Sequence, residues 1–141
     1  MGTIQAAVLV AAMATGQPVG PHHVGCNVNE IFTEHIHAHL AIEHRGTEVR
    51  IPANIGFVSA GYAVICIYWL HTHDDSGLIH IEAPGGAFTL ADFFAVWGQP
   101  LSPSRVGPYS GRVRAYVNGA PYKGAPQTIP LLDGEQIVLK V

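Results

Sequence analysis

Hydrophobic and polar side chains alternate most regularly between Thr33 and His44. On one side of an extended chain fall Ile36, Ala38, Leu40 and Ile42, and on the other fall His35, His37, His39, Ala41 and Glu43. Residues two apart in a strand point to the same face, so this segment is predicted to be a strand with an apolar face and a histidine face. Arg45-Gly46 predicts a tight turn and residues 47–51 a returning partner strand, which Pro52 ends because proline cannot donate a hydrogen bond to the sheet.

A second apolar segment, Val64–Leu70, carries hydrophobic side chains on both faces. This pattern is typical of a central strand that is covered on both sides. Residues 74–77 read Asp-Asp-Ser-Gly and predict a turn, and Leu78–Ala83 follows as a strand with His80 and Glu82 on one face. We expect the two strands to form a hairpin.

One helix is predicted, over Thr89–Gly98. Its apolar positions at i, i+3, i+4 and i+7 are Leu90, Phe93, Phe94 and Trp97. A stripe at this spacing indicates packing against the sheet rather than a cofactor site. Thr89 and Asp92 form a capping-box pattern at its start, and Gly98 stands where a helix commonly ends.

The C-terminal part is predicted to add more strands. Residues 99–111 are rich in Pro, Gly and Ser and predict a loop, whereas Arg112–Val117 and Gln136–Val141 predict strands, with Asn118-Gly119 as a hairpin turn. The segments together predict an α+β fold that is mostly β. We expect a small sheet or a barrel-like domain of six or more strands with one covering helix.

The N-terminal segment differs from the rest of the chain. Its apolar run, residues 3–14, is too short to span a bilayer as a helix. Ala12-Met13-Ala14 resembles a signal-peptidase site, although no positive residues precede it. We predict that residues 1–25 are an apolar arm or a signal remnant followed by a linker, and that residues 26–141 form a single histidine-rich β domain. As an arm, the segment can add a strand or a helix to a neighbouring copy of the chain.

Composition changes the picture in two ways. Only 12% of the 141 residues are charged, about half the usual share, so we expect the chain to bury surface against copies of itself as a homo-oligomer. The formal charge is -3 and no basic run occurs, which argues against a nucleic-acid partner. The nine histidines are the anomaly that calls for a chemical explanation.

Three segments carry histidines at strand spacing: His35-x-His37-x-His39, His71-x-His73 and His80-x-Glu82. Pairs of imidazoles on neighbouring strands, about 4.8 Å apart, can converge on one ion. The predicted metal ligands are therefore His35, His37, His39, His71, His73 and His80, with Glu82 as a further candidate. The remaining histidines, His22, His23 and His44, are expected on the surface or in ordinary hydrogen bonds.

A ligand set of imidazoles with one carboxylate suits zinc, copper, nickel or iron, and argues against calcium and magnesium. Of these metals we expect copper or zinc rather than iron or nickel. If the metal serves catalysis, Asp74 and Glu82 are the candidates for the acid or base. The alternative for Asp74, with Asp75, is that it caps the turn at Ser76-Gly77. Cys26 and Cys66 leave three interpretations open: a disulfide, two buried thiols, or a thiolate ligand.

Several stretches resemble a group of small, exported, uncharacterised bacterial proteins. The similarity rests on the motifs HxHxHL (residues 35–40), YWLHTHD with GxIHIE (68–82) and FFxVWG (93–98), and it covers roughly residues 26–141. It implies export and a shared histidine site, and it carries no activity with it. Compared with that group, this chain is shorter between Pro52 and Val64.

Three functions are consistent with these features. The first is a transition-metal binding protein of the exported compartment, acting as carrier, buffer or accessory factor, with a small-molecule or metal-delivery partner. The second is a small metal-dependent enzyme, hydrolytic or oxidative. The third is a self-assembling structural protein that uses the arm at residues 3–14. The chain contains no Gly-x-Ser-x-Gly elbow, phosphate-binding loop or dinucleotide fingerprint, which argues against other enzyme classes.

Overall fold

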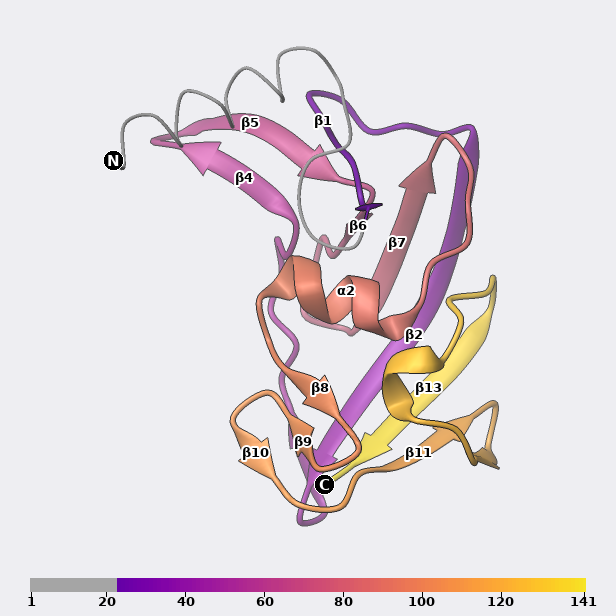
Figure 1. Ribbon diagram of the computed structural model, residues 1–141. Coiled ribbons are helices and arrows are strands. Elements are labelled where there is room, and N and C mark those ends of the chain that lie inside the picture. The colour runs from indigo at the N-terminus through magenta and orange to yellow at the C-terminus, as the bar shows by residue number, and fades with distance from the viewer. Residues whose placement is uncertain (1–22) are drawn as a thin grey trace.

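A mixed β-sheet forms the centre of the computed structural model, which describes residues 23–141 (Figure 1). Its strands in that range are β2 (Glu34–His44), β3 (Thr47–Val49), β6 (Leu70–His71), β7 (Leu78–Ala83), β11 (Arg114–Val117), β12 (Ala120–Tyr122) and β13 (Glu135–Lys140). They are ordered β12-β11-β13-β2-β7-β6, with β3 paired to the last residues of β2. The predicted apolar arm and His22 lie outside the described residues.

The long strand β2 organises this sheet. It pairs with β13 in parallel along one edge and with β7 antiparallel along the other. Ala38, Leu40 and Ile42 are buried on one face, as the alternation predicts, and the histidines alternate with them on the other. The predicted two-faced strand is therefore confirmed.

The helix α2 (Leu90–Trp97) lies across the apolar face of the sheet (Figure 1). It begins where predicted, because the backbone N–H of Thr89 donates to the Asp92 carboxylate at 2.8 Å. It ends at Gly98, whose φ of 76° is left-handed. Leu90, Phe93 and Phe94 are buried in one core with the apolar side chains of β2 and β7. Packing against the sheet is thus the role of the aromatic stripe.

The prediction that residues 64–70 form one central, doubly covered strand is wrong. The run is divided between β5 (Ala63–Tyr68) and β6, and β5 belongs to a separate small sheet with β1 (Cys26–Asn27) and β4 (Phe57–Ala60), in the order β1-β5-β4. The β4–β5 hairpin extends away from the large sheet (Figure 1), so within residues 23–141 no second layer covers the apolar side chains near its tip. Val64 is 46% exposed. Of the expected hairpin with β7, only the pairing of β6 is present: Leu70 lies opposite Ile81 and His71 lies opposite His80.

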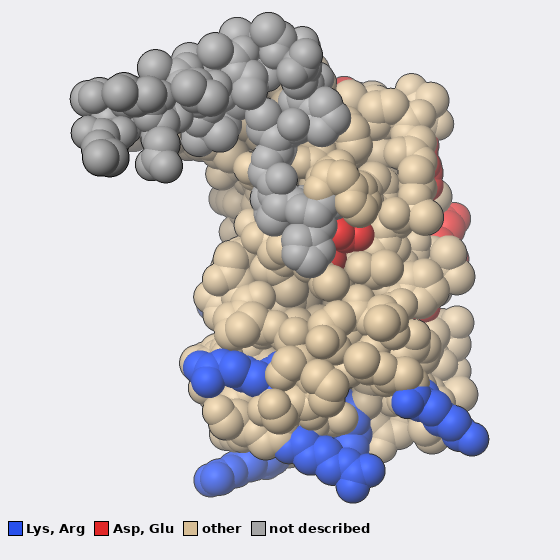
Figure 2. Space-filling view, in the orientation of Figure 1, with Lys and Arg blue, Asp and Glu red and all other residues tan. Residues whose placement is uncertain are grey.

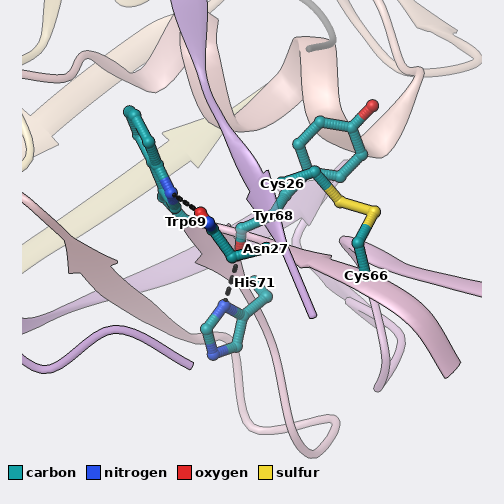
Figure 3. Close-up of a disulfide and its surroundings, with 6 residues drawn as sticks. All are labelled: Cys26, Asn27, Cys66, Tyr68, Trp69 and His71. Carbon is teal, nitrogen blue, oxygen red and sulfur yellow. Dashed lines mark hydrogen bonds between the residues drawn. A yellow bond between two sulfur atoms is a disulfide. The ribbon is translucent and has the colours of Figure 1, made fainter. Parts of the chain in front are cut away.

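Cys26 and Cys66 form a disulfide between β1 and β5 (Figure 3). Of the three interpretations of these cysteines, the disulfide is therefore correct, and neither residue is a thiolate ligand. A hydrogen bond of 2.6 Å from Trp69 Nε1 to Asn27 Oδ1 fastens the same two segments beside it. The disulfide thus ties the start of the described chain to the strand that leads into His71.

Residues 99–111, predicted as a loop, contain three two-residue strands: β8 (Leu101–Ser102), β9 (Arg105–Val106) and β10 (Tyr109–Ser110). Strands of this length are too short to produce a readable alternation. The Asn118-Gly119 turn joins β11 to β12 as predicted, and a 3-10 turn, η2 (Pro126–Thr128), precedes β13. The predicted fold class is confirmed. Within residues 23–141, no helix is long and apolar enough to cross a membrane.

The charged side chains are unevenly distributed. Figure 2 shows Lys and Arg gathered toward the end formed by β8, β9, β10 and β11, whereas the Asp and Glu visible on this face lie nearer the other end. The sequence contains no basic run, so tertiary structure brings these side chains together.

Candidate metal centre

Three strands present histidines in one row across the sheet. His37 on β2 pairs with His80 on β7, and His80 pairs with His71 on β6. Residues directly opposite one another point to the same face of a sheet, so the three imidazoles are neighbours. The ring centroids are 4.6 Å apart for His37 and His80, and 5.5 Å apart for His71 and His80. The row lies on the face opposite α2, because the intervening residues of these strands are in the core.

Glu82 lies in the next row, opposite His35. It is only 3% exposed although it is an acid. One carboxylate oxygen, Oε1, is 3.2 Å from Nε2 of His35 and 3.5 Å from Nδ1 of His80. The other, Oε2, is 3.3 Å from Nε2 of His71. A single buried carboxylate therefore contacts imidazoles from all three strands.

His73 reaches the same place from the loop after β6. The preceding residue, Thr72, is buried, and its hydroxyl donates to the Pro52 carbonyl at 2.8 Å while its N–H donates to Ile55. These bonds fix the loop, and the His73 ring lies 4.4 Å from that of His80 and 4.9 Å from that of His71. The sequence spacing His-x-His is thus preserved in space even though the strand has ended.

These side chains make two overlapping groups among the described residues. The inner cluster is His71, His73, His80 and Glu82, and the outer cluster is His35, His37 and His80. Within each cluster the candidate ligand atoms lie within 4.8 Å of one another. Tetrahedral ligands bonded at about 2.1 Å lie about 3.4 Å apart, so about an ångström of closure brings either set onto an ion. Both clusters therefore have the donor types and spacing of a transition-metal site.

The inner cluster contains three buried polar atoms for which residues 23–141 supply no hydrogen bond: His71 Nε2, His80 Nδ1 and Glu82 Oε2. The other ring nitrogen of His71, Nδ1, donates to the Tyr68 carbonyl at 2.7 Å (Figure 3), which leaves a lone pair on Nε2. That lone pair faces a carboxylate oxygen, so two acceptors oppose each other. Such an arrangement is costly unless a proton or a cation lies between them.

Burial controls the protonation of this cluster. Desolvation lowers the pKa of His71, and desolvation together with His73 and His37 lowers the pKa of His80 to about 4. Desolvation, the charge of Glu30 and a hydrogen bond to Glu30 raise the pKa of Glu82 to about 7. At neutral pH the two imidazoles are uncharged, which is the form that binds metals. Near pH 7 the Glu82 carboxyl is partly protonated, and a metal ion can take the place of this proton.

Sequence reasoning missed two residues of the site. Glu30 lies 3.3 Å from Nε2 of His73, and the Phe57 ring stands edge-on to His71 and His73, with centroids 5.7 and 5.5 Å away. Glu30 lies in a segment without periodicity, and Phe57 follows the Gly56 turn, so neither has a local signal. Phe57 begins β4 and Glu30 follows β1, so the β1-β5-β4 sheet carries the segments that bring both to the histidines.

Other predicted site residues lie elsewhere. His39 points to the histidine face but belongs to neither cluster, because its Nε2 donates to the Ser76 carbonyl at 2.7 Å. Asp74 caps its turn, accepting hydrogen bonds from Ser76 N at 3.0 Å and Ser76 Oγ at 2.5 Å, and these bonds lower the pKa of Asp74. His23 is exposed, and His44 stacks on Tyr109 with centroids 4.2 Å apart.

Comparison of the chain with protein-family models, with curated proteins and with solved structures finds no significant match in any of the three.

Proposed function

We propose that this chain binds a transition-metal ion, copper or zinc, through the inner cluster, and acts outside the cytoplasm as a metal carrier, buffer or accessory factor. The convergence of three buried atoms that form no hydrogen bond with residues 23–141, His71 Nε2, His80 Nδ1 and Glu82 Oε2, carries this proposal. Unsatisfied polar atoms are rare in protein interiors, and one cation satisfies all three together.

The donor set supports copper or zinc. Three imidazoles with one carboxylate give four donors, the number that zinc takes in a tetrahedral site. Imidazole also suits copper, whereas calcium and magnesium require mostly oxygen ligands.

The partial exposure of one ligand, His73, supports a site that can exchange its ion. Three of the four donors are shielded, but the side chain of His73 is 38% exposed. An ion that enters beside His73 meets one exposed ligand first and the buried ones afterwards. This order suits a carrier or buffer better than a permanent structural ion.

The Cys26–Cys66 disulfide supports a location outside the cytoplasm, because stable structural disulfides form mainly in oxidising compartments. The resemblance to small exported bacterial proteins points to the same compartment.

Elemental analysis of untagged, chelator-free protein tests the proposal. We expect the native chain, or the chain reconstituted with zinc or copper, to retain metal in the inner cluster. His71→Ala should lower the affinity at least tenfold, since it removes a buried ligand. His39→Ala is the matched control, because it lies on the same sheet face outside both clusters and should leave the affinity unchanged. Absence of bound metal after reconstitution would overturn the proposal.

A small hydrolytic or oxidative metalloenzyme is the second candidate. In this candidate the three histidines of the inner cluster hold the ion and Glu82 is not a ligand. The pKa of about 7 of the metal-free Glu82 then suits an acid–base catalyst, which works best near the operating pH. X-ray absorption of the zinc-loaded protein separates the candidates. An exchangeable water or anion bound to the ion favours the enzyme, and a shell closed by protein ligands excludes it.

A further inference from the structure

The outer cluster lies directly beside the inner one and shares His80 with it. Its two other members come from β2, where His35 and His37 have ring centroids 4.8 Å apart. The His37 ring stands edge-on to the His80 ring at an interplanar angle of 84°. The inner cluster does not use these two imidazoles, so they are free to bind a second ion.

Glu82 faces both clusters at once. Its Oε2 is directed to His71 of the inner cluster at 3.3 Å, and its Oε1 is directed to His35 of the outer cluster at 3.2 Å. Sites with two metal ions hold them about 3.5–4 Å apart. A carboxylate with one oxygen on each side can bridge two ions at that spacing.

We propose that the chain holds a second transition-metal ion at His35 and His37, next to the ion of the inner cluster. In this pair Glu82 bridges the two ions, and His80, which belongs to both clusters, lies between them. This inference rests on the proposed function and extends it from a one-metal to a two-metal centre.

The two positions differ in shielding. The inner ion has His71 and Glu82 as deeply buried ligands, whereas the side chain of His35 is 40% exposed and His37 is half-buried. The outer ion has fewer protein donors and faces solvent, so it keeps coordination positions for water or a small anion. It should therefore bind more weakly than the inner ion and exchange first.

The charges at the centre also indicate a third component. Two divalent ions bring four positive charges, and among residues 23–141 the carboxylates in contact with the clusters are those of Glu82 and Glu30. An oxyanion donor between the ions, such as hydroxide, carboxylate or phosphate, balances the remainder. Substrates or cargo ligands of this chemical class are the ones the pair would accept.

Metal stoichiometry of the full chain tests this inference. Titration of the metal-free protein with zinc, followed by native mass spectrometry and calorimetry, should show two equivalents, the first at least tenfold tighter. Combining His35→Ala with His37→Ala should leave one equivalent, with the first affinity changed less than about threefold. His39→Ala, at the next position on the same face of β2, should keep both. One equivalent in the native chain overturns the pair and leaves the proposed function standing, whereas no metal overturns both.

Electron paramagnetic resonance of the copper(II)-loaded native chain tests the bridge without relying on a variant. Two copper(II) ions about 4 Å apart are magnetically coupled, so the single-ion signal should grow with the first equivalent and fall with the second. Two independent single-ion signals at two equivalents would show separate sites and overturn the bridge.

Discussion

At the residue scale, Glu82 is the central residue of the site, because its carboxylate contacts imidazoles from three strands. Alternation along β7 places it on the face of His80, and this much follows from the sequence. The sequence does not show that the carboxylate is buried against three imidazoles and beside Glu30. Its raised pKa comes from that burial and from that neighbour.

The pH dependence of the metal-free protein follows from Glu82 and His80. The pKa of Glu82 rises from 4.5 to about 7 on folding, so its contribution to stability is present below pH 4.5 and is lost as pH rises to about 7. The pKa of His80 falls from 6.5 to about 4, so its contribution is present above pH 6.5 and is lost as pH falls to about 4. We expect denaturant unfolding of chelator-treated protein to show the greatest stability between about pH 4.5 and 6.5, where the two contributions overlap.

Glu82→Gln should remove the alkaline side of this profile. The amide does not titrate, so His80 alone shapes the profile of the metal-free variant. Its stability should rise as pH increases to 6.5 and stay level from pH 6.5 to 8, where the native chain loses stability. A variant that loses as much stability between pH 6.5 and 8 as the native chain would assign the fall to another group.

At the element scale, strands and helix follow local patterns only where a second layer covers them. The two faces of β2 and the capped helix α2 were predictable, because one face of each packs against the other. The run that includes β5 is equally apolar, but its first half projects from the core. An apolar segment gives no information on whether a second layer exists.

The disulfide should stabilise both the fold and the site. Its cysteines are 40 residues apart, and closing a loop of that size contributes about 3–4 kcal/mol. It also holds β5, whose last residue, Tyr68, orients His71 through its carbonyl. We expect Cys26→Ala with Cys66→Ala to lower the unfolding free energy by that amount and to weaken zinc binding about tenfold. An unchanged zinc affinity in the folded variant would show that the disulfide does not contribute to metal binding.

The turn before β7 depends on Gly77. Its φ is +85°, and a Cβ there would lie 2.1 Å from the Leu40 carbonyl oxygen of β2. Gly77→Ala should therefore cost more than about 2 kcal/mol, through both strain and collision. Gly46, with φ of +80° and open space around it, is the matched control, and Gly46→Ala should cost about 1 kcal/mol. Equal losses, measured by denaturant unfolding, would contradict a role for close approach.

At the scale of the whole molecule, the arrangement of the large sheet and the β1-β5-β4 sheet leaves apolar side chains of residues 23–141 exposed. Tyr62, Val64 and Ile65 are exposed on the β4–β5 hairpin, and Phe32 is exposed before β2. The low charged fraction predicts that the chain associates with copies of itself, and these side chains are the surface on which it would do so.

Light scattering measures that association. We expect a mass above that of one chain, and Val64→Lys should reduce it if the β4–β5 hairpin is the contact. Deletion of residues 1–20 should reduce it instead if the apolar arm docks into a neighbour. A single-chain mass for the native protein would contradict both.

The sequence by itself determined the strand with a histidine face, the capped helix, the mostly β class and the kinds of side chain that make up the candidate metal site. Each rests on a period or spacing within a few residues, and local backbone geometry fixes which side chains share a face. Only the tertiary structure decided that His71, His80 and His37 stand in one row, that Glu30 joins them and that His39 bonds to Ser76 instead. Strand order and register depend on pairing between distant segments, and no local period encodes that pairing.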